Sequence, residues 1–254
     1  MSPRNTRSRL LVVAVPALAI AAAIATVALS GAAVTGPAMK TIPAVAQSTL
    51  RRSLEKAAGL VPPPEKPYVL DSEGAKLEID PRAPWDPTSR IWTRPGRATA
   101  ELYYETPGDR PEASAEEREL LGPIEVSIEL NGESRLADLG SEGGTPRILP
   151  LRDAVVVEIS TIVPGSAEER VASMTPRQSA FRPAALTMFI GDPRTEAGIR
   201  SALKRGSDPP SALGRARNPA TLRLISIRLH GPKEPIEVLA QRIPAASLRA
   251  LLSR

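Results

Sequence analysis

The chain has 254 residues, 42% of them hydrophobic, which is enough for one large domain or two small domains with a buried core. It holds 27 prolines, which argue against a helical bundle, and no cysteine, which excludes disulfides, thiolate nucleophiles, iron–sulfur clusters and cysteine zinc sites. The net charge of +5 is uneven, since residues 41–150 carry −6 and residues 151–254 carry +7. The basic half could meet an acidic partner, although a mixed, well-solvated surface is the plainer interpretation.

The N-terminal part predicts a membrane segment. Residues 10–34 contain no charged side chain, and a helix of that length crosses a hydrocarbon core of about 30 Å. Arg4, Arg7 and Arg9 precede the segment, so the positive-inside rule leaves residues 1–9 in the cytoplasm as a basic region. The rest of the chain is then expected outside the cytoplasm.

Residues 10–34 could be an uncleaved transmembrane anchor or a cleaved signal. The run is longer than the 7–15 residues of a typical signal core, which favours the anchor and a single-pass membrane protein. Small residues suited to signal peptidase occur at 30–32 and 44–46, so a secreted or periplasmic product is the alternative. Both interpretations place residues 47–254 outside the cytoplasm, and whether cleavage occurs stays open.

Residues 35–66 are predicted to be a linker. A short helix is expected over 47–60, with Ser48 as its cap, an apolar repeat at Leu50, Leu54 and Ala58, and Gly59 near its end. The proline-rich stretch 61–67 follows and should be extended and stiff. We interpret this part as a spacer before an extracytoplasmic β-rich domain over 67–254.

Strand patterns dominate the remaining chain. Ile124, Val126 and Ile128 alternate with Glu125 and Ser127, which is typical of a strand with one wet face. This strand is expected over 124–130, and further strands are expected in a hairpin over 67–80 and at 98–105, 133–140, 153–163, 185–190, 221–229 and 235–243.

Helices are predicted to be few and short. They are expected at 114–118, 166–170, 192–206 and 247–254; in the third, Asp192 is the cap, Pro193 lies in the first turn and Gly206 ends the helix. The pattern favours a mainly β fold, an antiparallel β-sandwich-like domain with a few short helices. The alternative is an α+β domain whose sheet is covered by the helix at 193–205.

Two segments resemble each other, VSIELNG at 126–132 and ISIRLHG at 225–231. The chain's one histidine, His230, stands where the first segment has Asn131. Both residue types tolerate positive φ, and each precedes a glycine, so we interpret both sites as hairpin turns. This makes His230 a turn residue rather than a catalyst, and it leaves open whether the segments mark a duplication.

Two clusters are candidate binding sites. The four carboxylates Asp71, Glu73, Glu78 and Asp80 do not match the motif of a calcium-binding loop, so we interpret them as part of a solvated hairpin.

Trp85, Trp92, Tyr103 and Tyr104, with Asp86 and Arg90, form the second cluster. They could form a platform for a sugar or a proline-rich peptide, or they could simply fill the core.

A basic stretch over 194–228 could bind an anionic surface such as lipid headgroups or an acidic glycan, or it could be a solvated face. It lacks stacking aromatic residues, which argues against nucleic acid. Its basic residues are Arg194, Arg200, Lys204, Arg205, Arg215, Arg217, Arg223 and Arg228.

The chain shows no nucleophile elbow, phosphate loop, zinc-protease motif or dinucleotide fingerprint, so no catalytic, cofactor-binding or metal residue is assigned. We therefore expect a non-enzymatic, membrane-tethered or exported protein with a binding or envelope-assembly role. Its partners would be the membrane, through residues 10–34, and a protein or other envelope component. The alternative is a carboxylate-based hydrolase that acts on cell-envelope carbohydrate.

Overall fold

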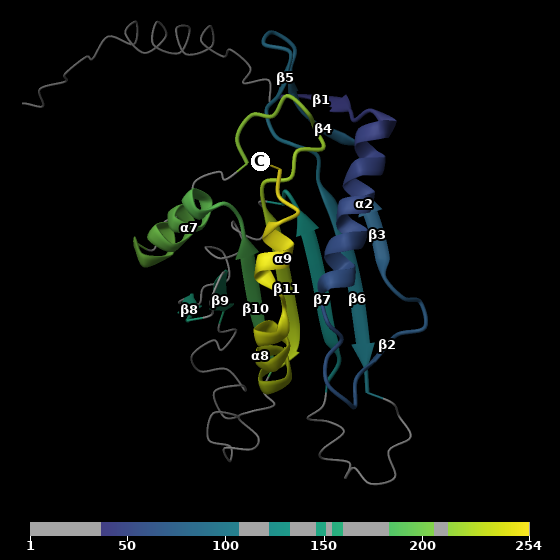
Figure 1. Cartoon of the computed structure of the whole chain (residues 1–254), viewed down its shortest axis with the longest axis vertical. Coiled ribbons are helices and arrows are strands. Elements are labelled where there is room, and N and C mark those ends of the chain that lie inside the picture. The colour runs from purple at the N-terminus through teal and green to yellow at the C-terminus, as the bar shows by residue number, and fades with distance from the viewer. Residues whose placement is uncertain are drawn as a thin grey trace, which may run out of the picture. The chain divides into compact units, whose positions relative to one another are not determined.

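A computed structural model describes residues 37–106, 122–132, 146–150, 154–159, 183–205 and 213–253. These residues belong to one compact unit, Pro37–Arg254. Within it, eight strands form a large sheet in the order β2-β6-β7-β11-β10-β9-β8, with β3 also paired to β6 (Figure 1). The strands are β2 (Val69–Leu70), β3 (Lys76–Ile79), β6 (Ala98–Glu105), β7 (Ile124–Leu130), β8 (Arg147–Leu149), β9 (Val155–Ile159), β10 (Pro183–Ile190) and β11 (Ile225–Pro232).

Every pairing between neighbouring strands is antiparallel. A smaller sheet of β1 (Ala38–Thr41), β4 (Arg82–Asp86) and β5 (Ile91–Trp92) lies at the upper end of the large sheet in Figure 1. The large sheet carries the main core, because the alternating apolar residues of β6, β7 and β11 turn to the same face.

Helices cover that apolar face. Helix α2 (Ala44–Leu60) packs on β3, β6 and β7, while α8 (Lys233–Arg242) packs on β10 and β11, and α9 (Ala245–Arg249) follows it. Leu50 and Leu54 of α2 are fully buried, as are Ile236 and Leu239 of α8. Burying one such side chain contributes about 1.5–3 kcal/mol, so these helices are integral to the fold.

Helix α7 (Pro193–Arg205) lies on the opposite face, at the β9–β10 end of the sheet. Val155, Val157 and Phe189 turn to this face and meet Ile199 of α7 in a second, smaller core. Asp192 caps the helix, since its Oδ1 accepts a hydrogen bond of 2.7 Å from the Thr195 N–H. The predicted helix and its cap are confirmed.

The structure confirms a mainly antiparallel β fold with a few short helices. The layer against the large sheet is helical, as in the α+β alternative, although α2 and α8 supply most of it. The segment over 235–243, predicted as a strand, is helix α8. Its buried residues, Ile236, Leu239 and Ala240, are spaced three and four apart, which is the period of a helix face.

The predicted hairpin over 67–80 is also wrong. Strands β2 and β3 both pair with β6 and not with each other. The turn at 71–74 therefore connects two strands that pair with successive parts of β6. Residues 38–61, expected in a spacer, belong to the folded unit: β1 pairs with β4, and α2 carries part of the core. Helix α2 begins three residues before the predicted start, after Pro43 and without a side-chain cap.

Several predicted elements lie outside the described residues, namely the membrane segment over 10–34, the strand over 133–140 and the helices over 114–118 and 166–170. Within the described ranges, no helix combines the length and apolar character needed to cross a bilayer.

The two similar segments lie side by side at the centre of the sheet. Strand β7 pairs with β11, and Ile128 stands opposite its counterpart Ile227. His230 is not in a turn: it lies within β11, between Glu125 of β7 and Ala185 of β10. The turn interpretation of this histidine is therefore wrong. Asn131 does adopt a positive φ of 56°, but its side chain is buried inside the fold.

Candidate functional site

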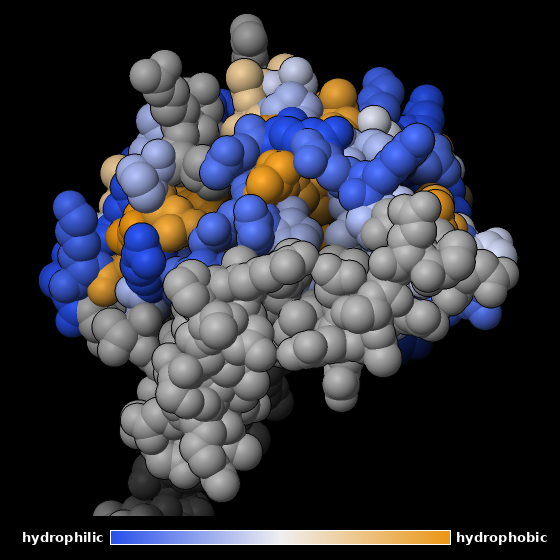
Figure 2. All heavy atoms as spheres, turned by 90° about the horizontal axis from the view of Figure 1, so that it is seen from below, coloured by the Kyte–Doolittle hydropathy of each residue, from blue (hydrophilic) through white to orange (hydrophobic). Residues whose placement is uncertain are grey.

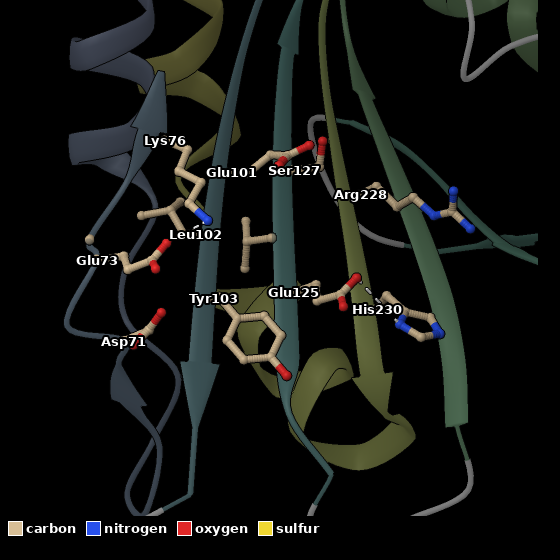
Figure 3. A pocket seen from close by; sticks show the side chains of 12 residues that line it. Asp71, Glu73, Lys76, Glu101, Leu102, Tyr103, Glu125, Ser127, Arg228 and His230 are labelled. Carbon is tan, nitrogen blue, oxygen red and sulfur yellow. Dashed lines mark ion pairs between the residues drawn. The ribbon is translucent and has the colours of Figure 1, made fainter. Parts of the chain in front are cut away.

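A groove of about 630 Å³ lies on the face of the large sheet opposite α2 and α8 (Figure 3). We call it the polar groove. It is lined by Asp71, Glu73, Gly74, Lys76, Glu101, Leu102, Tyr103, Glu125, Val126, Ser127, Arg228 and His230. The β2–β3 connection forms one wall, and β6, β7 and β11 form the floor.

Strand register sets the side chains of the floor in two rows. One row runs from Lys76 through Glu101 and Ser127 to Arg228, each residue standing opposite the next on the neighbouring strand. Side chains in a row are about 4.5–5.5 Å apart at Cβ, so neighbours can share one ligand group.

The second row consists of Tyr103, Glu125 and His230 (Figure 3). It lies two residues, about 7 Å, further along the strands than the first row. Asp71 borders it, because the Asp71 N–H donates to the Tyr103 carbonyl at 2.8 Å. The rows together offer alternating acceptors and donors across four strands, a layout suited to an extended polar ligand.

The charges of the groove are mostly exposed. Lys76 Nζ lies 2.6 Å from a Glu73 carboxylate oxygen, and this hydrogen bond, with the charge of Glu73, raises the pKa of Lys76. His230 Nδ1 lies 3.8 Å from Glu125 Oε2, beyond hydrogen-bond distance, and their side chains are 48% and 60% exposed. Four carboxylates face two permanent cations, so the groove favours a ligand that carries positive charge or hydroxyl groups.

His230 beside a carboxylate is also a unit that can move protons. Ser127 stands on the same face of β7, two residues from Glu125. His230 and Glu125 are both about half exposed, and their separation of 3.8 Å is longer than the 2.6–3.2 Å over which a general base takes up a proton.

The predicted carboxylate cluster is divided in the structure. Asp71 and Glu73 line the groove, while Glu78 lies on β3 opposite Thr99. Asp80 Oδ1 accepts a hydrogen bond from the Arg82 N–H at 2.9 Å and shapes a turn. Across the described ranges, no group of three potential ligand side chains could hold a metal ion.

The tryptophan platform is not formed as hypothesised. Trp92 is only 4% exposed, and its ring meets that of Trp85 edge to face at 4.9 Å. Lys40 Nζ lies 3.8 Å from the centre of the Trp85 ring, a cation–π contact that occupies this face. Asp86 accepts hydrogen bonds from Thr88 and Ser89 and fixes the β4–β5 turn. The core interpretation is confirmed for Trp92, and also for Tyr104, which is buried on β6.

The basic stretch over 194–228 is dispersed over three places. Arg194, Arg200, Lys204 and Arg205 lie on α7, where Arg200 donates to the Ala154 carbonyl at 2.7 Å. Arg215 and Arg217 flank Ala216, which pairs with Trp92 of β5, and the Arg223 guanidinium donates to the Arg215 carbonyl. Arg228 lines the polar groove. The stretch is therefore not one continuous face.

Sequence reasoning missed buried polar residues, among them Glu129 and Asn131. Glu129 continues the alternation of Glu125 and Ser127 along β7, yet it is buried and ion-paired with Arg97. Asn131 ties the end of β7 to the loop before β11 with hydrogen bonds on both ends of its amide. Neither residue has a sequence signal that separates it from an exposed polar residue of the same type.

Comparison of the chain with protein-family models, with curated proteins and with solved structures finds no match.

Proposed function

We propose that this protein is a membrane-tethered, extracytoplasmic binding protein of the cell envelope, without enzymatic activity, that engages a protein partner through the polar groove. The observation that carries the proposal is the pair of side-chain rows, which offer alternating charge and hydroxyl groups on an open sheet face. The excess of carboxylates favours a partner segment that carries lysine, arginine or hydroxyl groups.

The tether is proposed from the uncharged run over 10–34 and the three arginines before it. The fold bears on the choice of cleavage site. Cleavage at 44–46 would remove β1 from the small sheet and the first turn of α2, where Ala46 is buried. An uncleaved anchor, or cleavage at 30–32, keeps the folded unit whole. N-terminal sequencing of the exported protein distinguishes these, and a mature start at Gln47 would refute both.

Site-specific crosslinking tests the binding role. Because the chain has no cysteine, Ala75→Cys places one photo-crosslinker at the groove wall. A matched control, Lys56→Cys, lies on the exposed side of α2. We expect a defined crosslinked product in native membranes from position 75 that is absent at position 56 and lost in the Glu101→Gln/Glu125→Gln double variant. Equal capture at both positions, or capture that survives the double variant, would argue against the groove as the binding site.

The second candidate, a carboxylate-based hydrolase of envelope carbohydrate, is favoured by one observation. Glu101 and Glu125 both face the groove, and His230 lies beside Glu125. Purified full-length protein should then release soluble fragments from isolated cell-wall glycan, and Glu101→Gln or Glu125→Gln should abolish the release. Release by the wild-type protein that both variants lack would replace the binding proposal with this one.

A further inference from the structure

One end of the folded unit gathers basic side chains. The segments 37–42, 81–97 and 213–223 contain eight lysines and arginines and one acidic residue, Asp86. All eight basic residues are exposed. We call them the basic end patch: Lys40, Arg82, Arg90, Arg94, Arg97, Arg215, Arg217 and Arg223.

The backbone joins these three segments into one structure. Strand β1 pairs with β4, and β4 pairs with β5. Trp92 of β5 and Ala216 exchange two backbone hydrogen bonds, of 2.8 and 3.0 Å. The Arg223 guanidinium donates to the Arg215 carbonyl at 3.4 Å. The three segments that carry the basic residues therefore lie together, at the end of the large sheet where β1, β4 and β5 lie (Figure 1).

Two large apolar side chains are exposed at the same end. Met39 on β1 is 54% exposed, and Val45 in the first turn of α2 is 79% exposed. Exposed apolar residues among lysines and arginines are the composition of surfaces that rest in the headgroup region of a bilayer.

The chain connects this end directly to the proposed tether. The uncharged run ends at residue 34, and β1 begins at Ala38. Three intervening residues span at most roughly 11 Å, so a tether at 10–34 would hold the basic end patch close to the membrane surface.

The groove reaches from the middle of the sheet towards its other end. Strand β2 and the last residues of β6, which border it, are at the lower end in Figure 1. From Glu125 to the end of β7 at Leu130 the strand rises roughly 17 Å. Figure 2 views that lower end, and its described part is mostly hydrophilic, with separate hydrophobic patches.

We infer that the basic end patch binds anionic phospholipid headgroups, so that the folded unit stands on the membrane with the polar groove directed away from it. The inference rests on the proposed tether and adds the orientation and the lipid class. Charge complementarity carries it: all eight cations are exposed, and the three segments that hold them contain one acidic residue, Asp86.

The test uses the full chain reconstituted into phosphatidylcholine vesicles with or without phosphatidylglycerol. Thr88→Cys places a fluorophore at the tip of the β4–β5 turn, and Ala75→Cys places one at the groove wall. A quencher attached to lipid headgroups should quench the label at position 88 only when phosphatidylglycerol is present. At about 1 M salt, where the Debye length is about 3 Å, the quenching should be lost. The label at position 75 should stay unquenched throughout.

Charge removal sharpens the test. The triple variant Arg90→Gln/Arg215→Gln/Arg217→Gln should lower the equilibrium constant for docking on the order of 100-fold, because each of the three arginines contributes a similar factor to the affinity for an anionic surface. The matched control, Arg194→Gln/Lys204→Gln/Arg205→Gln, removes three exposed charges from α7 and should leave quenching unchanged.

The failures of the two proposals are distinguishable. If the protein washes off the vesicles at alkaline pH, the tether is refuted. The quenching experiment can then be repeated with this free protein and phosphatidylglycerol vesicles, and it still tests whether the basic end patch binds anionic headgroups. Stable insertion with quenching at position 88 that ignores phosphatidylglycerol, or that both triple variants reduce equally, overturns the lipid inference. Retention on an acidic polysaccharide through the patch, without any effect of phosphatidylglycerol, overturns it as well.

Discussion

Asn131 offers the sharpest test of the folded structure. Its side chain is buried where β7 ends, and its amide group joins three parts of the chain. The Nδ2 group donates to the carbonyls of Gly96 at 2.9 Å and Thr221 at 2.8 Å. The Oδ1 atom accepts from the Arg223 N–H at 2.9 Å and more weakly from the Leu224 N–H at 3.5 Å.

The expected cost follows from these bonds. Asn131→Gly keeps the left-handed backbone, with φ at 56°, but deletes three good hydrogen bonds and leaves their backbone partners unpaired. At about 1 kcal/mol for each bond, the free energy of unfolding should fall by about 3 kcal/mol. Asn131→Ala should lose roughly 1 kcal/mol more, because a Cβ without a polar group is strained at positive φ.

Urea unfolding of the full chain in a mild detergent, followed by tryptophan fluorescence, measures both variants. Asn218→Ala is the matched control, since this exposed asparagine makes one local bond, to the Ala220 N–H at 2.9 Å. It should cost no more than about 1 kcal/mol. A loss below about 1 kcal/mol for Asn131→Gly would refute the reasoning, because the three bonds would then contribute nothing net.

Gly132→Ala would place a methyl group onto the buried Glu129 carboxylate and disrupt its ion pair, so the free energy of unfolding in urea should fall by about 2 kcal/mol; an unchanged midpoint would contradict this. Tyr68→Phe removes a buried hydroxyl group for which the described structure provides no hydrogen-bond partner, and stability should rise by about 1 kcal/mol at pH 7. Burial also raises the pKa of Tyr68 to about 12, so the wild-type protein should lose stability as pH rises from the unfolded value near 10 towards 12, and a pH series should show a smaller loss for the variant. Asp192→Ala removes the cap of α7 and should cost about 1 kcal/mol at pH 7 in thermal unfolding. Backbone hydrogen bonds lower the pKa of Asp192, so its contribution is present above the unfolded value and declines as pH falls through the lowered one; a cost that does not shrink in acid would count against this cause.

The strands were predictable where one face is wet and the other buried. Strand β7 alternates cleanly, and the predicted inward positions, Ile124, Val126 and Ile128, are all buried. Helix α8 was missed because Val238 beside Leu239 fits a short apolar strand as well as a helix face. Only packing against β10 and β11 decides between them, and a local pattern does not contain that information.

The polar groove illustrates the same limit. The outward positions Glu125 and Ser127 followed from alternation, and both line it. Their neighbours did not, because Glu101 and Arg228 meet Ser127 only through a register set by long-range pairing. Sequence reasoning could name the wet side of one strand but not the side chains placed beside it.

The similar segments 126–132 and 225–231 place their equivalent polar residues in different roles. Strands β7 and β11 are antiparallel, so equivalent residues on either side of the Ile128–Ile227 pair lie at opposite ends of the sheet. Asn131 falls at the end that loops and the small sheet enclose, where a buried amide must find partners. His230 falls at the end that borders the groove, where its ring is about half exposed. The identical hydrophobic residues of the two segments pack in the same core, whereas Asn131 and His230 lie in different surroundings.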